Sequence, residues 1–263
     1  MRRRLTCVAA LAAAATVALA GCASTESGGY TIKQGQLTTC ADVPYPPFED
    51  FDSSTASGFT GFDVEIVGAI AERLNLELVV RDVDFDALQS GVVLAAGECD
   101  MGSSAITITE ARQANIDFSD PYYDSLQSLL VPVASGLTGL ADLANGVIGV
   151  QAGTTGRSYA QQHAPASAQL REFPSDGELW PALQAGQIDA ILQDQPVNNF
   201  HVQADADYVI VEEYQTDEQY GFAFAKGERT QLIADINAQL AAIRADGTYQ
   251  RIYDKWFTAG GNS

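Results

Sequence analysis

A group of small hydrogen-bond donors and one arginine follow a predicted strand in the first half of the chain. The segment 104–107 (Ser-Ala-Ile-Thr) comes at the end of the strand predicted at 100–104, and Arg112 follows it. Backbone N–H groups and hydroxyls are compact donors, and a guanidinium binds a carboxylate through two parallel hydrogen bonds. The pattern predicts a carboxylate receptor, although Arg112 alone could equally be a surface side chain paired with Glu110 or Asp117. The predicted receptor residues are Ser104, Ala105, Thr107 and Arg112.

A turn rich in glycine and threonine predicts a second site for negative charge. The segment 151–156 (Gln-Ala-Gly-Thr-Thr-Gly) lies between a predicted strand at 147–151 and a predicted helix at about 157–163. The free N–H groups at a helix N-terminus bind anions. The segment lacks the Gly-Lys-Ser/Thr of a P-loop and has no nearby lysine, which disfavours phosphate as the anion. Gln151 and Thr155 are the candidate side chains in this turn.

A carboxylate at the end of a buried strand also needs a partner. Asp194 follows the strand predicted at 188–193, and an unpaired buried charge is costly. The partner of Asp194 is either the cationic group of a bound ligand or a local arginine such as Arg157.

The loop after the first predicted strand contains three prolines around an aromatic residue. Its sequence at 42–49 is Asp-Val-Pro-Tyr-Pro-Pro-Phe-Glu, which predicts a rigid loop that presents Asp42 and Tyr45. Many loops of prolines and aromatic residues are purely structural, so the pattern alone leaves the function of these two residues open. We expect Phe48 and Glu49 to be structural.

Apolar runs of strand length alternate with helical patterns along the body, as in an α/β fold with parallel sheets. Asp63 is the predicted cap of the first helix, and the segment 175–178 has the spacing of a capping box. The predicted strands are 37–42, 76–80, 100–104, 147–151, 170–173 and 188–193. The predicted helices are 61–74, 85–93, 157–163, 177–184 and a final amphipathic stretch with Leu232, Ile236, Leu240 and Ile243.

Together with Phe118-Ser119-Asp120-Pro121-Tyr122-Tyr123, these segments resemble the family 3 extracellular solute-binding proteins of polar amino-acid ABC transporters, which include the glutamine- and histidine-binding proteins. The resemblance implies a type II periplasmic-binding-protein-like fold with two lobes. Each lobe is a mostly parallel sheet flanked by helices, and a two-strand hinge at 122–126 and 218–222 joins them. Lobe 1 comprises 37–124 and 219–263, and lobe 2 comprises 125–218. Ligands of such sheets bind beyond the carboxyl ends of the strands.

The resemblance also implies a role for each candidate side chain. Ala105, Thr107, Arg112 and Thr155 hold the α-carboxylate of the ligand, and Asp194 holds its ammonium. Asp42, Tyr45, Phe85, Gln151 and Gln193 contact the ligand side chain. The implied function is capture of a free L-α-amino acid by hinge closure and delivery to an ABC permease with its cytoplasmic ATPase, without catalysis or a cofactor. Asp42 beside two amides favours a ligand with an amide or cationic side chain.

Two other functions remain open at this stage. An enzyme of the same fold, such as a cyclohexadienyl or arogenate dehydratase, also uses an arginine for a carboxylate. It needs a general acid, for which Asp42 and Glu49 are the candidates, whereas an ammonium-binding Asp194 argues against it. A binding module that reports to a sensor protein has the same ligand chemistry and differs only in its partner.

The N-terminal residues predict export. Three arginines precede an apolar stretch at 5–20, which fits a secretory signal and is short for a membrane span. The stretch ends in Leu19-Ala20-Gly21-Cys22, similar to a bacterial lipoprotein signal; ordinary cleavage beside an idle thiol is the alternative. We expect 1–21 to be a removed signal peptide and 22–36 a flexible tether. Lipid on Cys22 then anchors the protein to the outer face of the cell membrane.

Charge, cysteines and histidines restrict the partners. Removal of 1–21 takes away three of the fourteen basic residues and none of the 34 acidic ones, so the net charge changes from −20 to −23 and disfavours nucleic acid. Cys40 and Cys99 remain as an even pair in an oxidising compartment. Because the resemblance makes their strands neighbours, we expect a disulfide, with two buried thiols as the alternative. His163 and His201 are far apart and predict no metal site, and we expect a monomer.

Overall fold

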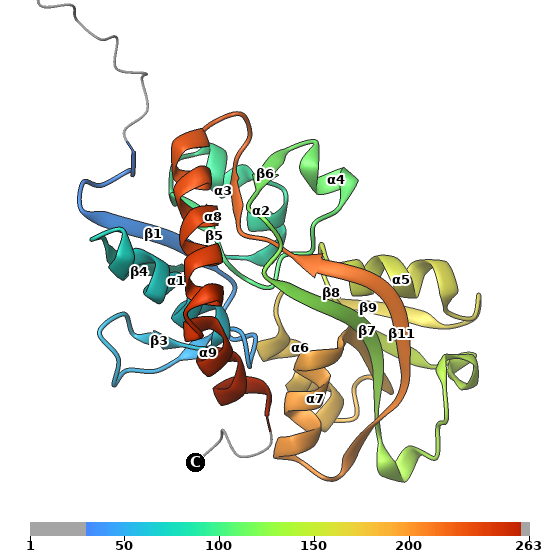
Figure 1. Ribbon diagram of the computed structural model, residues 1–263. Coiled ribbons are helices and arrows are strands. Elements are labelled where there is room, and N and C mark those ends of the chain that lie inside the picture. Colours follow the sequence, from blue (N-terminus) through green and yellow to red (C-terminus); the bar gives the residue numbers. More distant parts are fainter. Residues whose placement is uncertain (1–29, 259–263) are drawn as a thin grey trace, which may run out of the picture.

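The computed structural model describes residues 30–258, which form two lobes, each built on a five-stranded sheet flanked by helices (Figure 1). The strand order is β4-β1-β5-β12-β6 in the first sheet and β11-β7-β10-β8-β9 in the second. This architecture agrees with the predicted type II fold.

The elements of the first lobe come from both ends of the chain. Its strands are β1 (Gln36–Ala41), β4 (Glu77–Asp82), β5 (Met101–Gly102), β6 (Ile116–Phe118) and β12 (Ala223–Ala225), with a separate hairpin of β2 (Asp50–Phe51) and β3 (Phe59–Thr60). Its helices are α1 (Phe62–Arg73), α2 (Phe85–Gln89), α3 (Val92–Ala95), α4 (Glu110–Gln113), α8 (Thr230–Ala245) and α9 (Thr248–Phe257).

The elements of the second lobe are consecutive in the chain. Its strands are β7 (Tyr123–Pro132), β8 (Val147–Gln151), β9 (Gln169–Phe173), β10 (Ala190–Asp194) and β11 (Tyr208–Tyr220). Its helices are α5 (Thr155–His163), α6 (Asp176–Gln184) and α7 (Gln195–Ala204), with short 3₁₀ turns η1 (Val133–Ser135) and η2 (Leu140–Leu143).

Each sheet is mixed rather than mostly parallel. In the first sheet β1 runs parallel to β4 and β5, whereas β12 is antiparallel to β5 and β6. In the second sheet β8 is parallel to β9 and β10, whereas β7 is antiparallel to β10 and β11. The two strands that run against the others are β7, which begins at the first chain crossing, and β12, which follows the second.

Two strands run side by side between the lobes. β7 and β11 pair through Tyr123 with Tyr220 and Ser125 with Glu218, within the segments that the sequence predicts as crossings. Their register shifts between Tyr214 and Glu218. The division of the chain into 37–124 with 219–263 and 125–218 stays a prediction that these strands support.

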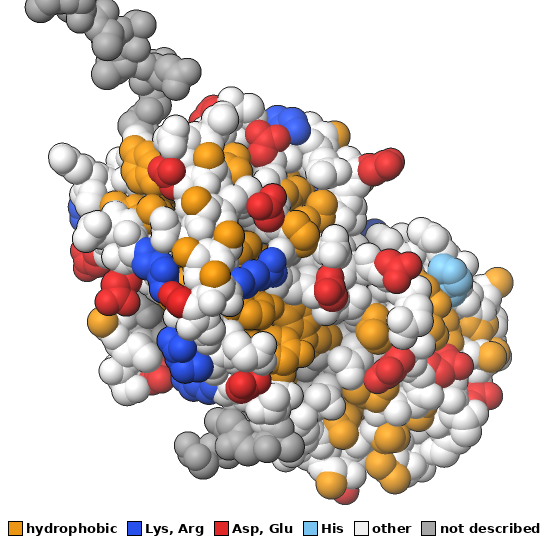
Figure 2. Space-filling view, in the orientation of Figure 1, with side chains coloured by type: hydrophobic (Ala, Val, Ile, Leu, Met, Phe, Trp, Pro, Cys, Tyr) orange, Lys and Arg blue, Asp and Glu red, His pale blue; other side chains and the backbone are white. Residues whose placement is uncertain are grey.

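The C-terminal helices complete the core of the first lobe. α8 and α9 pack on α1 (Figure 1), and α8 buries Leu232, Ile236, Leu240 and Ile243, the apolar face that its spacing predicts. α1 buries Val64, Val67, Ile70 and Ala71 in the same way, and Leu74 is partly buried. On the outside, Figure 2 shows Asp and Glu side chains on both lobes, as the strongly negative charge requires.

Three local predictions are wrong. The helix predicted at 85–93 is broken into α2 and α3 by Gly91, where φ is 84° and a Cβ would lie 2.6 Å from Ile116. The third strand, predicted at 100–104, is reduced to β5. Ser175 precedes α6, but its side chain accepts no hydrogen bond from the first turn of the helix, so the capping box does not form.

Asp63 is not the cap of α1. The chain enters α1 through Gly61, and no side chain caps this end. The carboxylate of Asp63 is instead buried and accepts hydrogen bonds from the N–H of Ala105 at 3.0 Å and the hydroxyl of Tyr122 at 2.6 Å. A residue expected to serve a helix end therefore supports the strand-end loop predicted to bind a carboxylate.

The end of the predicted tether is attached to the first lobe. The hydroxyl of Tyr30 donates to Asp235 at 2.9 Å, and the N–H of Ile32 donates to Asp100 at 2.6 Å. The predicted tether at 22–36 therefore extends too far, because Tyr30 and Ile32 already contact the first lobe. The predicted signal peptide and Cys22 lie outside the described residues. Among helices within 30–258, none has both the length and the apolar character needed to cross a membrane.

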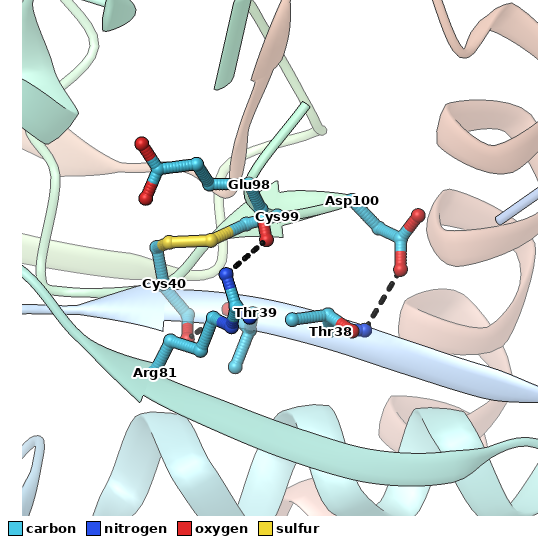
Figure 3. Close-up of a disulfide and its surroundings, with 8 residues drawn as sticks. Thr38, Thr39, Cys40, Arg81, Glu98, Cys99 and Asp100 are labelled. Atoms are coloured by element: carbon cyan, nitrogen blue, oxygen red, sulfur yellow. Dashed lines mark hydrogen bonds between the residues drawn. A yellow bond between two sulfur atoms is a disulfide. The ribbon is translucent and has the colours of Figure 1, made fainter. Parts of the chain in front are cut away.

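A disulfide joins Cys40 of β1 to Cys99, just before β5 (Figure 3). Their Cα atoms are 5.8 Å apart, and both side chains are buried. Nearby, the side chain of Arg81 donates to the carbonyl of Glu98 and Asp100 accepts from the N–H of Thr38. The bridge therefore fixes the start of β5, and with it the loop that follows.

Removal of this bridge by Cys40→Ala with Cys99→Ala is expected to lower the free energy of unfolding by about 2–4 kcal/mol, mainly because the unfolded chain gains freedom. Denaturant titration of both proteins measures this difference. Mass spectrometry of the unreduced parent is expected to find no free thiol, and complete alkylation of both cysteines in the native parent would contradict the bridge.

Candidate functional site

Side chains from both lobes meet in one cavity at the ends of several strands. The cavity is lined by Asp42, Tyr45, Phe85, Ser104, Ala105, Thr107, Arg112, Gln151, Thr154, Thr155 and Asp194. All residues predicted for the site are in this list except Gln193, and Thr154 is added. Segments separated by up to 152 positions, from Asp42 to Asp194, are brought together because their strands end at the same junction between the lobes.

Arg112 is buried in the cavity wall, with 5% of its surface exposed. Its Nη1 donates to the carbonyl of Thr107 at 2.8 Å and its Nη2 to the carbonyl of Gly153 at 3.0 Å, so one guanidinium contacts both lobes. The guanidinium carbon lies 5.3 Å from the centre of the Phe85 ring, a favourable cation–π distance.

Neither predicted surface partner engages Arg112. Asp117 forms its ion pair with Lys226, at 2.8 Å, and within residues 30–258 Arg112 takes part in no ion pair. The interpretation of Arg112 as an ordinary surface arginine is therefore wrong. A buried guanidinium whose charge is not neutralised by a contacting carboxylate is an attractive place for an anionic group.

The loop at 104–105 rests on two buried carboxyl groups. Glu49 accepts a hydrogen bond from the hydroxyl of Ser104, and Asp63 accepts the N–H of Ala105. Burial raises the pKa of Asp63 to about 7, and burial together with the charge of Asp63 raises the pKa of Glu49 well above its usual value. Because Asp63 already uses the Ala105 N–H, that group is not available to a ligand, contrary to the prediction.

Glu218 lies between the two threonines that were predicted to hold a carboxylate. Its Oε2 accepts hydrogen bonds from the hydroxyls of Thr107 and Thr155, both at 2.8 Å. Its Oε1 accepts from the amide of Gln127 at 3.1 Å. Thr107 follows a strand of the first lobe and Thr155 begins α5 of the second, so Glu218 links the lobes beside the hinge.

Asp194 is buried at the end of β10 and has only neutral hydrogen-bond donors as partners. The hydroxyl of Tyr220 and the amide of Gln127 donate to it, each at 2.5 Å. Burial and then the charge of Glu218 raise the pKa of Asp194 to about 6, while the hydrogen bonds oppose this increase. The carboxylate has no cationic partner among the described residues, although the sequence made Arg157 a candidate.

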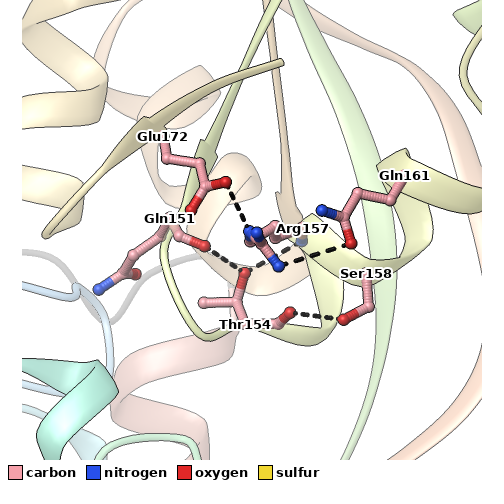
Figure 4. A network of polar contacts seen from close by, with 6 residues as sticks. All are labelled: Gln151, Thr154, Arg157, Ser158, Gln161 and Glu172. Atoms are coloured by element: carbon pink, nitrogen blue, oxygen red, sulfur yellow. Dashed lines mark hydrogen bonds and ion pairs between the residues drawn. The ribbon is translucent and has the colours of Figure 1, made fainter.

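That candidate, Arg157, points elsewhere. Its guanidinium forms an ion pair with Glu172 at 2.8 Å (Figure 4). The N-cap of α5 is Thr154, whose hydroxyl accepts the N–H of Arg157 at 3.1 Å and donates to the carbonyl of Gln151 at 2.8 Å. These bonds fix the turn at 151–156 and direct Gln151 and Thr155 towards the cavity.

Asp42 and Gln151 close the cavity from opposite lobes. The amide of Gln151 donates to Asp42 at 2.5 Å and to the carbonyl of Pro174 at 3.0 Å. Burial raises the pKa of Asp42 to about 7, with further increases from Asp82, Asp84 and Asp176. The aromatic rings of Tyr45 and Phe85 are also buried in the wall. This end of the cavity is therefore acidic and aromatic.

Gln193 does not line the cavity. Its amide donates to Asp176 at 3.0 Å and to the side-chain oxygen of Asn198 at 3.1 Å, inside the second lobe. Asp176 also contacts His201, whose ring stacks on Trp180. Neighbouring residues of a strand point to opposite faces, so Asp194 faces the cavity and Gln193 does not.

Besides Thr154, the sequence prediction missed Gln127, Glu218 and Tyr220, which form hydrogen bonds with the predicted residues. Gln127 lies in the polar half of β7, between Leu126 and Ser128, so its residue type gave no signal. Glu218 lies in a strand with many exposed acidic residues, where nothing in the residue pattern distinguishes it from its neighbours. Within 30–258 no cluster of His, Cys, Asp and Glu has the arrangement of a metal site.

Comparisons with known proteins identify the family. The family model of bacterial extracellular solute-binding proteins, family 3, matches residues 37–259. An ABC transporter glutamine-binding protein of Bacillus subtilis is 32% identical over 256 residues, which cover 92% of this chain and 93% of that protein.

Solved structures give the same result. An ancestral arginine-binding protein bound to glutamine has a TM-score of 0.79 and 32% identity, and the match covers 86% of this chain and 100% of that one. An ancestral amino-acid-binding protein, a precursor of cyclohexadienyl dehydratase, has a TM-score of 0.78 and 31% identity over 86% of this chain and 97% of that one.

Proposed function

The chain belongs to the bacterial extracellular solute-binding proteins, family 3, and we propose that it captures a free L-α-amino acid with an amide or cationic side chain. As the substrate-binding component of an amino-acid ABC importer, it passes this amino acid to the permease. Capture requires binding and closure of the lobes, and no covalent chemistry.

One observation carries this proposal. A buried guanidinium without a carboxylate partner, Arg112, and a buried carboxylate without a cationic partner, Asp194, line the same cavity. An amino acid supplies the missing partner of each, because it carries a carboxylate and an ammonium on one carbon. In the proposed complex, Arg112 with the hydroxyls of Thr107 and Thr155 holds the carboxylate, and Asp194 holds the ammonium.

The acidic and aromatic end of the cavity supports the choice of side chain. The Asp42 carboxyl group and the Gln151 amide are both within the wall, and a carboxylate accepts hydrogen bonds from an amide or a cationic group. Tyr45 and Phe85 supply apolar surface for the stem of the side chain. A ligand carboxylate at this end, as in Asp or Glu, meets like charge and is disfavoured.

The proposal includes the location and partners of the protein. Members of this family act outside the cytoplasm, and the lipoprotein-like sequence at Cys22 supports attachment to the outer face of the cell membrane. We infer that the chain works there as a monomer, with permease subunits and a cytoplasmic ATPase. A sensor protein is the alternative partner, and deletion of a neighbouring permease gene separates uptake from signalling.

A thermal-shift screen tests the ligand class. With the best of the common amino acids, citrulline and ornithine, at a hundredfold excess over Kd, the free energy of unfolding is expected to rise by about 2.7 kcal/mol. The melting temperature should then increase by about 5–10 °C. We expect L-glutamine, L-arginine or a relative of these to give the largest shift. The largest shift from Asp or Glu would contradict the side-chain assignment, and no shift from any amino acid would contradict the function.

A further inference from the structure

The carboxylate of Glu218 uses the donors that the proposed ligand needs. A hydroxyl has one proton to donate, and both Thr107 and Thr155 donate theirs to Oε2 of Glu218, at 2.8 Å in each case. A carboxylate that lies between these hydroxyls is in the position proposed for the α-carboxylate of an amino acid. The two carboxylates cannot receive the same two protons at once.

The negative charge of Glu218 also opposes binding of the ligand α-carboxylate. Glu218 is 8% exposed, and Gln127 holds it beside Asp194 by donating to both carboxylates from one amide nitrogen. Burial lowers the pKa of the nearby Arg112, and the charges of Asp194 and Glu218 oppose this decrease. An arriving α-carboxylate therefore meets a like charge at short range, where little water screens the repulsion.

The Glu218 side chain also borders a surface groove, which offers it a second position. Besides contacting the two threonines at the cavity, it lines a groove on the protein surface together with Thr216, Asp217 and Tyr159. Thr107 and Thr155 line both the cavity and this groove, so they form the wall between them. A rotation of the Glu218 side chain towards the groove frees both hydroxyl protons and returns the carboxylate to water.

From these contacts we propose that Glu218 is an internal competitor for the α-carboxylate and thereby sets the affinity for the amino acid. This inference rests on the proposed function. In the unliganded protein, Glu218 occupies the carboxylate cradle, and the ligand displaces it into the groove. The apparent affinity is then lower than the intrinsic affinity by the fraction of molecules in which the cradle is free.

Calorimetric titration of Glu218→Gln and Glu218→Ala tests the inference. The amide is isosteric with the carboxylate but is neutral and competes weakly, and alanine removes the competitor. We expect both variants to bind at least about tenfold more tightly than the parent. The probes are L-glutamine, which has a neutral side chain, and L-arginine. Asp217→Asn is the matched control, because it removes one negative charge from the next residue, and asparagine accepts the left-handed backbone at this position, where φ is 51°.

The outcomes separate the possible roles of Glu218. Unchanged or weaker binding by Glu218→Gln overturns the inference, because a residue that merely latches the lobes together lowers affinity when it is removed. An equal gain in Asp217→Asn also overturns it, since net charge alone then explains the effect. If a variant does not fold, a crystal structure of the parent with L-glutamine or L-arginine decides: Glu218 must have left both threonine hydroxyls. A parent that binds neither these probes nor any amino acid in the screen contradicts the proposed function instead.

Discussion

Replacement of Arg112 with alanine is expected to weaken amino-acid binding by about 3–5 kcal/mol. The reason is the location of this guanidinium, which is buried at the junction of the lobes and fixed by the carbonyls of Thr107 and Gly153. In the alanine variant, the α-carboxylate enters the closed cavity without a cationic partner. Arg112→Lys should recover only part of the loss, because an ammonium lacks the planar fork that binds a carboxylate bidentately.

Calorimetry on the purified variants measures this effect, and Arg157→Ala is the control. Arg157 also lies next to the turn at 151–156, but its guanidinium pairs with Glu172 near the surface, so its removal should change the affinity by less than about threefold. Thermal melting without ligand shows whether Arg112→Ala still folds. If the Arg112→Ala protein folds and its affinity for the amino acid is within about threefold of that of the parent, the assignment of the carboxylate site is wrong.

The location of the site was predictable because of the topology. Parallel strands of one sheet present their carboxyl ends at the same edge. β1 does so in the first sheet and β8 and β10 in the second, and the prediction chose residues at or just beyond these ends. Asp42, Gln151 and Asp194 each lie at such an end, and all three line the cavity. Strand ends are visible in a sequence as the point where an apolar run stops.

The remaining contacts depend on tertiary packing, which the local pattern does not contain. Asp63 has the position of a helix cap, and only the approach of the Ala105 loop makes it a buried support. Gln193 and Asp194 are neighbours, and one residue of strand register decides which of them faces the cavity. Glu218 becomes part of the cradle because β11 returns to pair with β7 at Ser125, a contact between residues 93 positions apart.

Asp194 is the residue on which the amino-acid assignment depends most. Its carboxylate is buried with only neutral donors around it, and in the proposed complex the ligand ammonium neutralises its charge. Replacement of that ammonium in the ligand by a keto or hydroxy group is expected to cost at least several kcal/mol. Asp194→Asn should weaken amino-acid binding to a similar extent without unfolding the free protein, since the amide keeps the shape but not the charge.

The raised pKa of Asp194, about 6 without ligand, gives this assignment a pH dependence. Binding of an ammonium requires the ionised carboxylate, so protons compete with the ligand, and the contribution of Asp194 to affinity should fall about tenfold between pH 7 and pH 5.

The contribution of Asp194 to the stability of the unliganded protein changes with pH in the opposite direction. Because the folded state holds this proton more tightly than the unfolded state, the stabilisation from Asp194 is present below pH 4 and is lost as the pH rises through about 6.

The comparison of an amino acid with its α-keto analogue, on the parent and on Asp194→Asn, separates a binding protein for amino acids from a dehydratase that acts on prephenate. Glu213→Gln, on the exposed part of β11, controls for the loss of one negative charge. A dehydratase that acts on prephenate, which has no amine, favours the ligand without an ammonium and gains nothing from a carboxylate at 194. A binding protein for amino acids favours the ammonium and loses that preference in Asp194→Asn. Equal affinity of the parent for the amino acid and its keto analogue would overturn the role of Asp194, and the proposed ligand class with it.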